Sequence, residues 1–206
     1  MTTARQAVGF LGVCLVAIWL TLGGLSERAR ARSLTAGGFS FSDELSGFEL
    51  VGISGAGTPG DPIVITERVT TLEPSLLVIR RAGEKRAVGG TLDFFAVAIK
   101  TVVINATGRV WSGFDLELRE QRDRPSVYGD GLSFDQLHSL ADVAPESDRF
   151  AKSTWAAEPY DRIYFRLGSV DPGTRVALVF AVADISPIRK FYLMQQPLYL
   201  TARMAP

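Results

Sequence analysis

Apolar and polar residues alternate with a period of two along much of the chain after residue 38. In the clearest segment, Phe114, Leu116 and Leu118 alternate with acidic residues, and residues 163–167 follow the same pattern. A period of two places alternate side chains on opposite faces of a β-strand. We therefore expect these strands to have one packed face and one solvated face.

Other apolar segments are short, rich in β-branched or aromatic residues, and bounded by Gly, Pro, Asp or Ser, which is typical of strands. They predict strands at 48–53, 63–70, 76–80, 92–104, 176–182 and 191–200. Within 92–104 the apolar residues change face near Ile99, which predicts a bulge or a bend between two sheets. Pro197 lacks an N–H, so it marks the last segment as an edge strand or a broken one.

Helical periodicity is confined to residues 134–140, where Ser133 is available as an N-cap for one or two turns. About eight strands with frequent turn signals predict an all-β fold. We expect an antiparallel two-sheet β-sandwich, Ig-like or jelly-roll-like, with a barrel as the alternative.

The N-terminus carries a different pattern. An uncharged apolar run extends from Ala7 to Leu25, with Arg5 before it and the small residues Ala29 and Ala31 after it. This order predicts a signal helix over 1–31 with cleavage after Ala31, a flexible lead-in over 32–38 and a β-sandwich domain over 39–206. The alternative is an uncleaved membrane anchor. Either way, we expect a secreted, periplasmic or cell-surface location, with membrane contact only through the uncleaved N-terminal segment.

The balance of charged residues and the number of cysteines limit which partners and which chemistry we expect. The 22 basic residues balance the 22 acidic ones, and no run of like charge is long enough to act as an acidic or basic tail. No basic field is therefore available to attract nucleic acid. The one cysteine, Cys14, lies in the apolar run, so the exported domain would have neither a disulfide nor a thiolate nucleophile.

No sequence motif predicts an enzyme. Residues 55–60 match G-x-G-x-x-G, but Pro59 and the strand that follows leave no helix to bind a pyrophosphate, so we interpret the match as a hairpin loop. His138 is the one histidine and has no partner at catalytic or metal spacing. A hydrolase with paired carboxylates remains the enzymatic alternative, although Asp115 and Glu117 have the alternation of a solvated face.

The sequence predicts no cofactor, with calcium as a weak possibility. Asp130 lies between two glycines and Asp135 follows soon after, which would let a loop fold around a cation. The spacing of an EF-hand loop is absent, and an Asp-Gly turn is the simpler interpretation.

Aromatic residues near strand ends are the candidates for ligand contact. These are Trp111, Tyr128, Trp155 and Tyr160, to which we add Asp130 and Asp135. Exposed aromatic rings stack on the apolar faces of sugars, whereas the alternative is that the tryptophans close the ends of the core. Asn105-Ala106-Thr107 also matches the N-glycosylation pattern.

Three segments resemble a family of proteins. They are Val103 to Leu118, with the pattern N-x-T-G-x-x-W-x-G-F-x-x-x-L, together with Tyr128 to Phe134 and Val170 to Gly173. The pattern resembles small, uncharacterised exported bacterial β-sandwich domains over roughly residues 39–185. The resemblance implies a fold and an exported location, and it transfers no active site.

These observations predict a non-enzymatic exported protein that binds an envelope protein or a polysaccharide through its loops. A carbohydrate-active hydrolase and a structural envelope or matrix component are the alternatives. The structural role would use strand 191–200 for self-association.

Overall fold

The computed structural model describes residues 31–82, 94–127, 129–135, 140, 143–157, 159–186 and 188–199. Residues from Ala31 to the C-terminus form one compact unit, which is separate from Met1–Arg30. The predicted signal helix, Ala29 and Cys14 lie outside the described residues, as do Tyr128 and His138. No helix in the described ranges is long and apolar enough to span a membrane.

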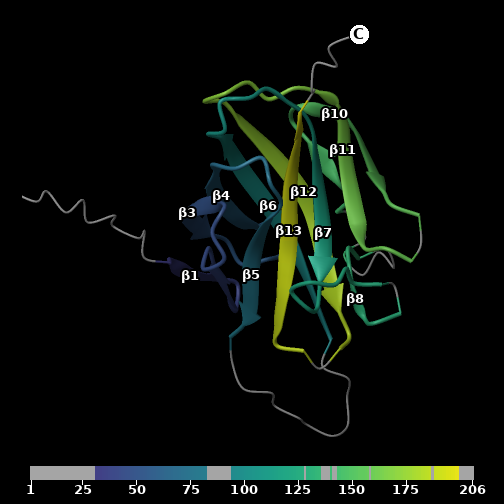
Figure 1. Ribbon diagram of the computed structural model, residues 1–206. Helices are drawn as coiled ribbons and strands as arrows, with labels where there is room; N and C mark the ends of the chain where they lie inside the picture. The colour runs from purple at the N-terminus through teal and green to yellow at the C-terminus, as the bar shows by residue number, and fades with distance from the viewer. Residues whose placement is uncertain are drawn as a thin grey trace, which may run out of the picture. The chain divides into compact units, whose positions relative to one another are not determined.

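Two open β-sheets form the compact unit (Figure 1). The seven-stranded sheet has the order β1-β2-β5-β13-β7-β11-β10. Its strands are β1 (Ser33–Ala36), β2 (Phe39–Ser42), β5 (Ser75–Arg81), β7 (Trp111–Arg119), β10 (Phe150–Trp155), β11 (Arg162–Gly168) and β13 (Lys190–Tyr199).

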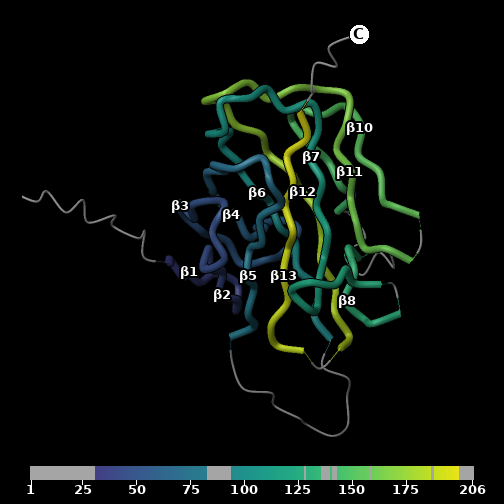
Figure 2. The backbone as a smooth tube through the Cα atoms, in the orientation of Figure 1, coloured from purple at the N-terminus to yellow at the C-terminus, as the bar shows by residue number. Residues whose placement is uncertain are grey.

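The six-stranded sheet has the order β3-β4-β6-β12-β8, and β9 also pairs with β12. Its strands are β3 (Phe48–Ser54), β4 (Ile63–Val69), β6 (Phe95–Asn105), β8 (Leu132–Ser133), β9 (Glu146–Ser147) and β12 (Arg175–Asp184). The chain crosses between the sheets repeatedly, so strands adjacent in sequence often lie in different sheets (Figure 2). Apolar residues from both sheets fill the space between them, among them Phe114, Phe165 and Phe180.

The fold is all-β and sandwich-like, as predicted, but the prediction of about eight antiparallel strands was wrong in two respects. The described chain has 13 strands. Five of them were not predicted: β1, β2, β8 and β9 have only two to four residues each, and β10 carries no apolar alternation. Strands β4 and β6 pair in parallel, with Ile63 opposite Ile99. Residues 33–36, expected in a flexible lead-in, form β1 because they pair with β2.

Strand β6 runs without a bulge. Its pairing with β12 keeps one register from Phe95 to Ile104, so the bend predicted near Ile99 was wrong. The face opposite Val97 and Ile99 carries the small residues Ala96, which is half-buried, and Ala98, which is buried.

Strand β13 lies inside its sheet, between β5 and β7, and so the prediction of an edge strand was wrong. Pairing with β5 ends at Gln195, whereas pairing with β7 continues past Pro197. Proline is tolerated here because β13 has only one neighbour at this position and needs no N–H on the other side.

The G-x-G-x-x-G segment is a hairpin loop between β3 and β4, as predicted. Gly55 has φ +96°, and a Cβ atom at this position would lie 2.0 Å from the Pro62 carbonyl oxygen. The Asp61 carboxylate accepts the Ala56 N–H at 3.0 Å. Glycine is therefore required here by the conformation of the turn.

One acidic residue lies in the middle of the core. Glu67 on β4 is fully buried, and Gln195 on β13 donates a hydrogen bond to its Oε2 at 2.9 Å. The desolvation of Glu67 raises the pKa of the carboxyl to about 7, and the Gln195 hydrogen bond opposes the rise. The pair joins the two sheets through polar groups.

Candidate functional site

Two loops meet at one end of the seven-stranded sheet and bring several predicted site residues together. The connection from β7 to β8 pairs with the connection from β10 to β11 through a β-bridge between Val127 and Tyr160. The Ser126 N–H also donates to the Leu118 carbonyl at 2.9 Å. In Figure 1 the closed end of the β10–β11 hairpin and β8 lie toward the same end of the fold. Asp130, Trp155 and Tyr160 therefore belong to one region of the surface.

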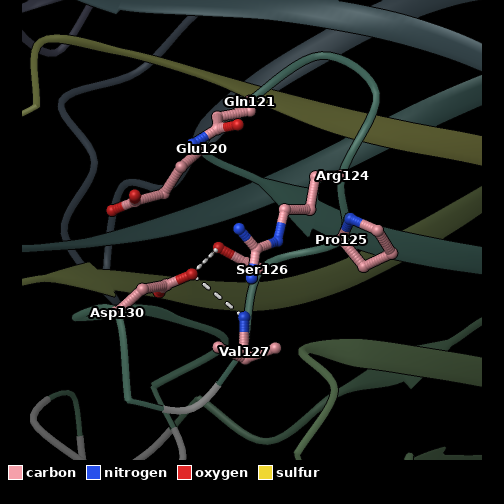
Figure 3. Close-up of a pocket in the computed structure, with 7 residues that line it drawn as sticks. All are labelled: Glu120, Gln121, Arg124, Pro125, Ser126, Val127 and Asp130. Atoms are coloured by element: carbon pink, nitrogen blue, oxygen red, sulfur yellow. Dashed lines mark hydrogen bonds between the residues drawn. The ribbon is translucent and has the colours of Figure 1, made fainter.

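The Asp130 carboxylate organises the first loop (Figure 3). It accepts hydrogen bonds from the Ser126 hydroxyl at 2.6 Å and from the Val127 N–H at 3.0 Å. Its other oxygen accepts the Leu132 N–H at 3.1 Å. These three bonds fix the turn before β8, in agreement with the predicted Asp-Gly turn.

A small pocket lies beside this carboxylate and has a volume of about 120 Å³. Its lining residues are Glu120, Gln121, Arg124, Pro125, Ser126, Val127 and Asp130. The pocket carries acidic, basic and amide groups in a small space. It therefore offers hydrogen-bond donors and acceptors without a large apolar surface.

Asp161 is fully buried, and its N–H faces the carbonyl oxygen of the pocket residue Ser126 at 3.5 Å. Neither of its carboxylate oxygens has a hydrogen-bond partner within the described part of the chain. Burial and the negative charge of Asp130 raise the pKa of Asp161 to about 7, and the nearby Phe134 N–H opposes the rise. This carboxyl therefore takes up a proton at a higher pH than an exposed aspartate does.

Two further acids share this region. Burial raises the pKa of Glu120, and the charges of Asp130 and Asp184 add to the rise while Ser186 opposes it. Burial also raises the pKa of Asp184, against hydrogen bonds from Ser186 and the charge of Arg81. The repulsion among these acids is relieved by protonation or by an incoming donor.

Exposed aromatic rings flank the loop from β10 to β11. Tyr160 is 52% exposed and Trp155 is 37% exposed, and they lie at the two ends of this loop. Tyr160 is bridged to Val127, which lines the pocket. An apolar, stackable surface is therefore placed next to polar groups.

Trp111 was predicted as a ligand contact, and this prediction was wrong. The side chain is fully buried, and its Nε1–H donates to the Thr107 hydroxyl at 3.0 Å. Trp111 closes the core at the turn from β6 to β7, which was the alternative considered for it. Its indole packs against Phe114, with ring centroids 5.6 Å apart.

Asn105 does not fit the role of a glycan acceptor, although its tripeptide matches the pattern. It is fully buried, and its amide donates to the carbonyls of Arg109 at 2.7 Å and Val170 at 3.0 Å. Its Oδ1 accepts the N–H and the hydroxyl of Thr107. The N-x-T-G-x-x-W pattern thus describes a hydrogen-bonded turn.

The predicted calcium ligands are both engaged with protein groups. The Asp135 carboxylate accepts the Leu140 N–H at 2.7 Å, and Asp130 has the three partners described above. Across the described ranges, no group of three or more His, Cys, Asp or Glu side chains is arranged to hold a metal ion.

Asp115 and Glu117 alternate with core residues as predicted, but their face of β7 is not solvated. Both are buried, because long arginines from β11 cover them. Arg166 pairs with Asp115 at 2.6 Å, and Arg162 pairs with Glu117. Alternation identified the strand correctly, whereas the solvation of its second face depended on a neighbouring strand.

Comparison with known proteins identifies no relative: no family model, curated protein or solved structure matches this chain.

The site residues that sequence reasoning missed are Glu120, Arg124 and Asp161. They are ordinary charged residues in or beside loops, and backbone pairing between the two loops brings them together. Asp161 follows the predicted Tyr160 directly, which was the one available signal.

Proposed function

We propose that this chain is an exported, non-enzymatic binding protein that holds a polysaccharide where Trp155 and Tyr160 are exposed. The observation that carries the proposal is the backbone bridge that pairs the exposed Tyr160 with Val127, a residue that lines the polar pocket. Sugars present an apolar ring face and several hydroxyl groups, so a binding site needs a stacking surface next to donors and acceptors.

The charged side chains that line the pocket can form hydrogen bonds with sugar hydroxyl groups. Glu120 and Asp130 line the pocket and place acidic side chains at it. Arg124 and Gln121 are exposed at the pocket and supply donors. Bonds to charged groups contribute more than bonds between neutral ones, by roughly a factor of two.

Catalysis is a weaker proposal at the same place. The hydrolase alternative expects two carboxyls that flank a cleft, and Glu120 and Asp130 do line one pocket. However, the Asp130 carboxylate already accepts three hydrogen bonds that hold its own loop. The acid with the most clearly raised pKa, Asp161, is fully buried and outside the lining.

The exported location is part of the proposal and rests on the sequence of residues 1–31 and on the resemblance to exported bacterial β-sandwich domains. Fractionation of expressing cells, with mass spectrometry of the mature N-terminus, tests it. We expect the protein outside the cytoplasm, starting at Arg32. A cytoplasmic protein that retains its N-terminal segment would contradict this half of the proposal.

Affinity electrophoresis in gels that contain cellulose derivatives, xylan, glucan or mannan tests the binding half. We expect at least one neutral polysaccharide to retard the protein, and we expect the Tyr160→Ala and Trp155→Ala variants to lose most of this retardation. Tyr199→Ala is the matched control, because Tyr199 is also 37% exposed but ends β13. Equal retardation of all variants would place the site elsewhere.

A further inference from the structure

A second, larger hollow lies on the outer face of the six-stranded sheet, and three arginines line it. We name it the arginine groove; it has a volume of about 600 Å³. Its lining residues are Arg68, Ile104, Asn105, Ala106, Gly108, Arg149, Pro172, Gly173, Thr174 and Arg175. No acidic residue is among them.

Strand register explains why the arginines gather here. Ile104 on β6 is paired with Arg68 on β4 and with Arg175 on β12. All three side chains are on the outer face, because the next residues along β4 and β12, Val69 and Val176, are buried in the core. With strands about 4.8 Å apart, the Cα atoms of the two arginines are roughly 10 Å apart across the sheet.

Arg149 joins them from the turn that follows β9. The Asp148 carboxylate accepts the Ala177 N–H at 2.8 Å, which ties this turn to the start of β12. The Asp148 N–H returns a bond to the Ala177 carbonyl at 3.3 Å. The turn is therefore held against the strand that carries Arg175.

The arginines of the groove form few ion pairs. In the described chain, no carboxylate lies within ion-pair distance of the guanidinium groups of Arg149 and Arg175. Arg68 pairs only loosely with Glu49, at 3.7 Å, and both side chains are about half exposed. Exposed pairs of this kind contribute little and are readily exchanged for another anion.

We infer that the arginine groove binds the carboxylates of an acidic polysaccharide, at a site separate from the aromatic one. Guanidinium groups bind carboxylates through two parallel hydrogen bonds. A uronate residue combines such a carboxylate with an apolar ring face, which matches Ile104 between Arg68 and Arg175. An acidic peptide carries its carboxylates on flexible stems, whose ordering costs more entropy. Nucleic acid is disfavoured because no aromatic ring lines the groove for base stacking.

Affinity electrophoresis in polygalacturonate gels tests the inference with the Arg149→Gln/Arg175→Gln double variant. The control is Arg122→Gln/Lys152→Gln, which removes the same charge from exposed positions outside the groove. We expect the groove variant to bind at least about tenfold more weakly, since two charge-assisted contacts are lost. The control should stay within about twofold, and binding should weaken as salt increases.

Further probes separate the possible ligands. We expect inorganic phosphate to compete with polygalacturonate, neutral dextran not to bind the groove, and Tyr160→Ala to leave polygalacturonate binding unchanged. The inference is overturned if the groove variant binds like the wild type or if the control loses as much affinity. It is also overturned if polyglutamate binds more tightly than polygalacturonate, or if phosphate binds while the polymer does not.

Discussion

Single buried residues determine how this fold responds to pH. The pKa values of Glu67 and Asp161 are both raised to about 7 in the folded protein. Between the ordinary carboxyl pKa and pH 7, the folded state holds protons that the unfolded state has lost. Stability therefore decreases as pH rises through this window, and levels off above it.

Glu67→Gln should stabilise the protein at pH 8 and leave its stability near pH 4 almost unchanged. The expected gain is up to about 3 kcal/mol, because a shift from 4.5 to about 7 costs that amount once the carboxyl is ionised in both states. The new amide also supplies an N–H near Gln195, whose Oε1 has no partner in the described chain. Urea denaturation at both pH values measures the effect.

The control for this prediction is Glu49→Gln, since Glu49 is exposed on β3. We expect this variant to change stability by less than about 0.5 kcal/mol. A Glu67→Gln protein that is less stable than the wild type at pH 8 would show that the carboxylate is ionised and favourably bound in the core.

At the scale of elements, the single residues on which the fold depends most lie in turns rather than in strands. The β6–β7 turn depends on Asn105, whose amide bonds four groups from three residues. Two of these are carbonyls that lose their Asn105 donor when the amide is removed.

Asn105→Ala should therefore destabilise the protein by roughly 2–3 kcal/mol, since it removes all four hydrogen bonds of a buried side chain. Thermal unfolding monitored by circular dichroism measures the loss. Gln196→Ala removes a half-buried amide from β13 and should cost much less. Equal effects of the two substitutions would mean that the Asn105 network contributes little.

The β3–β4 hairpin depends on Gly55 in a comparable way. Gly55→Ala combines a positive φ with a Cβ atom 2.0 Å from the Pro62 oxygen, so the loop must move. We expect a loss of roughly 3 kcal/mol or more, measured by urea denaturation. Gly60→Ala, in the same loop but with open space around it, should stay within about 0.5 kcal/mol. A wild-type-like Gly55→Ala protein would contradict this account of the loop.

Across the whole molecule, the alternation of apolar residues was sufficient to predict the long strands and the all-β class. It missed β10, because Ala151, Lys152, Ser153 and Thr154 carry no apolar pattern, and such an edge strand forms through pairing with β11. The alternation also gave no indication that Trp111 is buried, because burial depends on packing that no local pattern contains.

The candidate site was only half predictable: Asp130, Trp155 and Tyr160 were recognised, whereas Glu120 and Asp161 join them through the bridge between two distant loops.

The arginine groove lay beyond sequence reasoning for the same reason. Arg68, Arg149 and Arg175 are far apart in the chain, and the balanced total charge gives no indication of them. Their proximity depends on the parallel pairing of β4 with β6, which the antiparallel prediction excluded. The register of the paired strands, rather than the overall composition, brings the arginines together and produces the local positive charge.

The central claim is that ligand covers the exposed aromatic end of the sheet, and tryptophan fluorescence with iodide quenching tests it most directly. In a Trp19→Phe background the emission comes from buried Trp111 and exposed Trp155. We predict that the polysaccharide that retards the protein most strongly protects Trp155 from iodide, and that Tyr160→Ala abolishes this protection. Saturating polysaccharide that leaves the quenching of Trp155 unchanged would contradict the account.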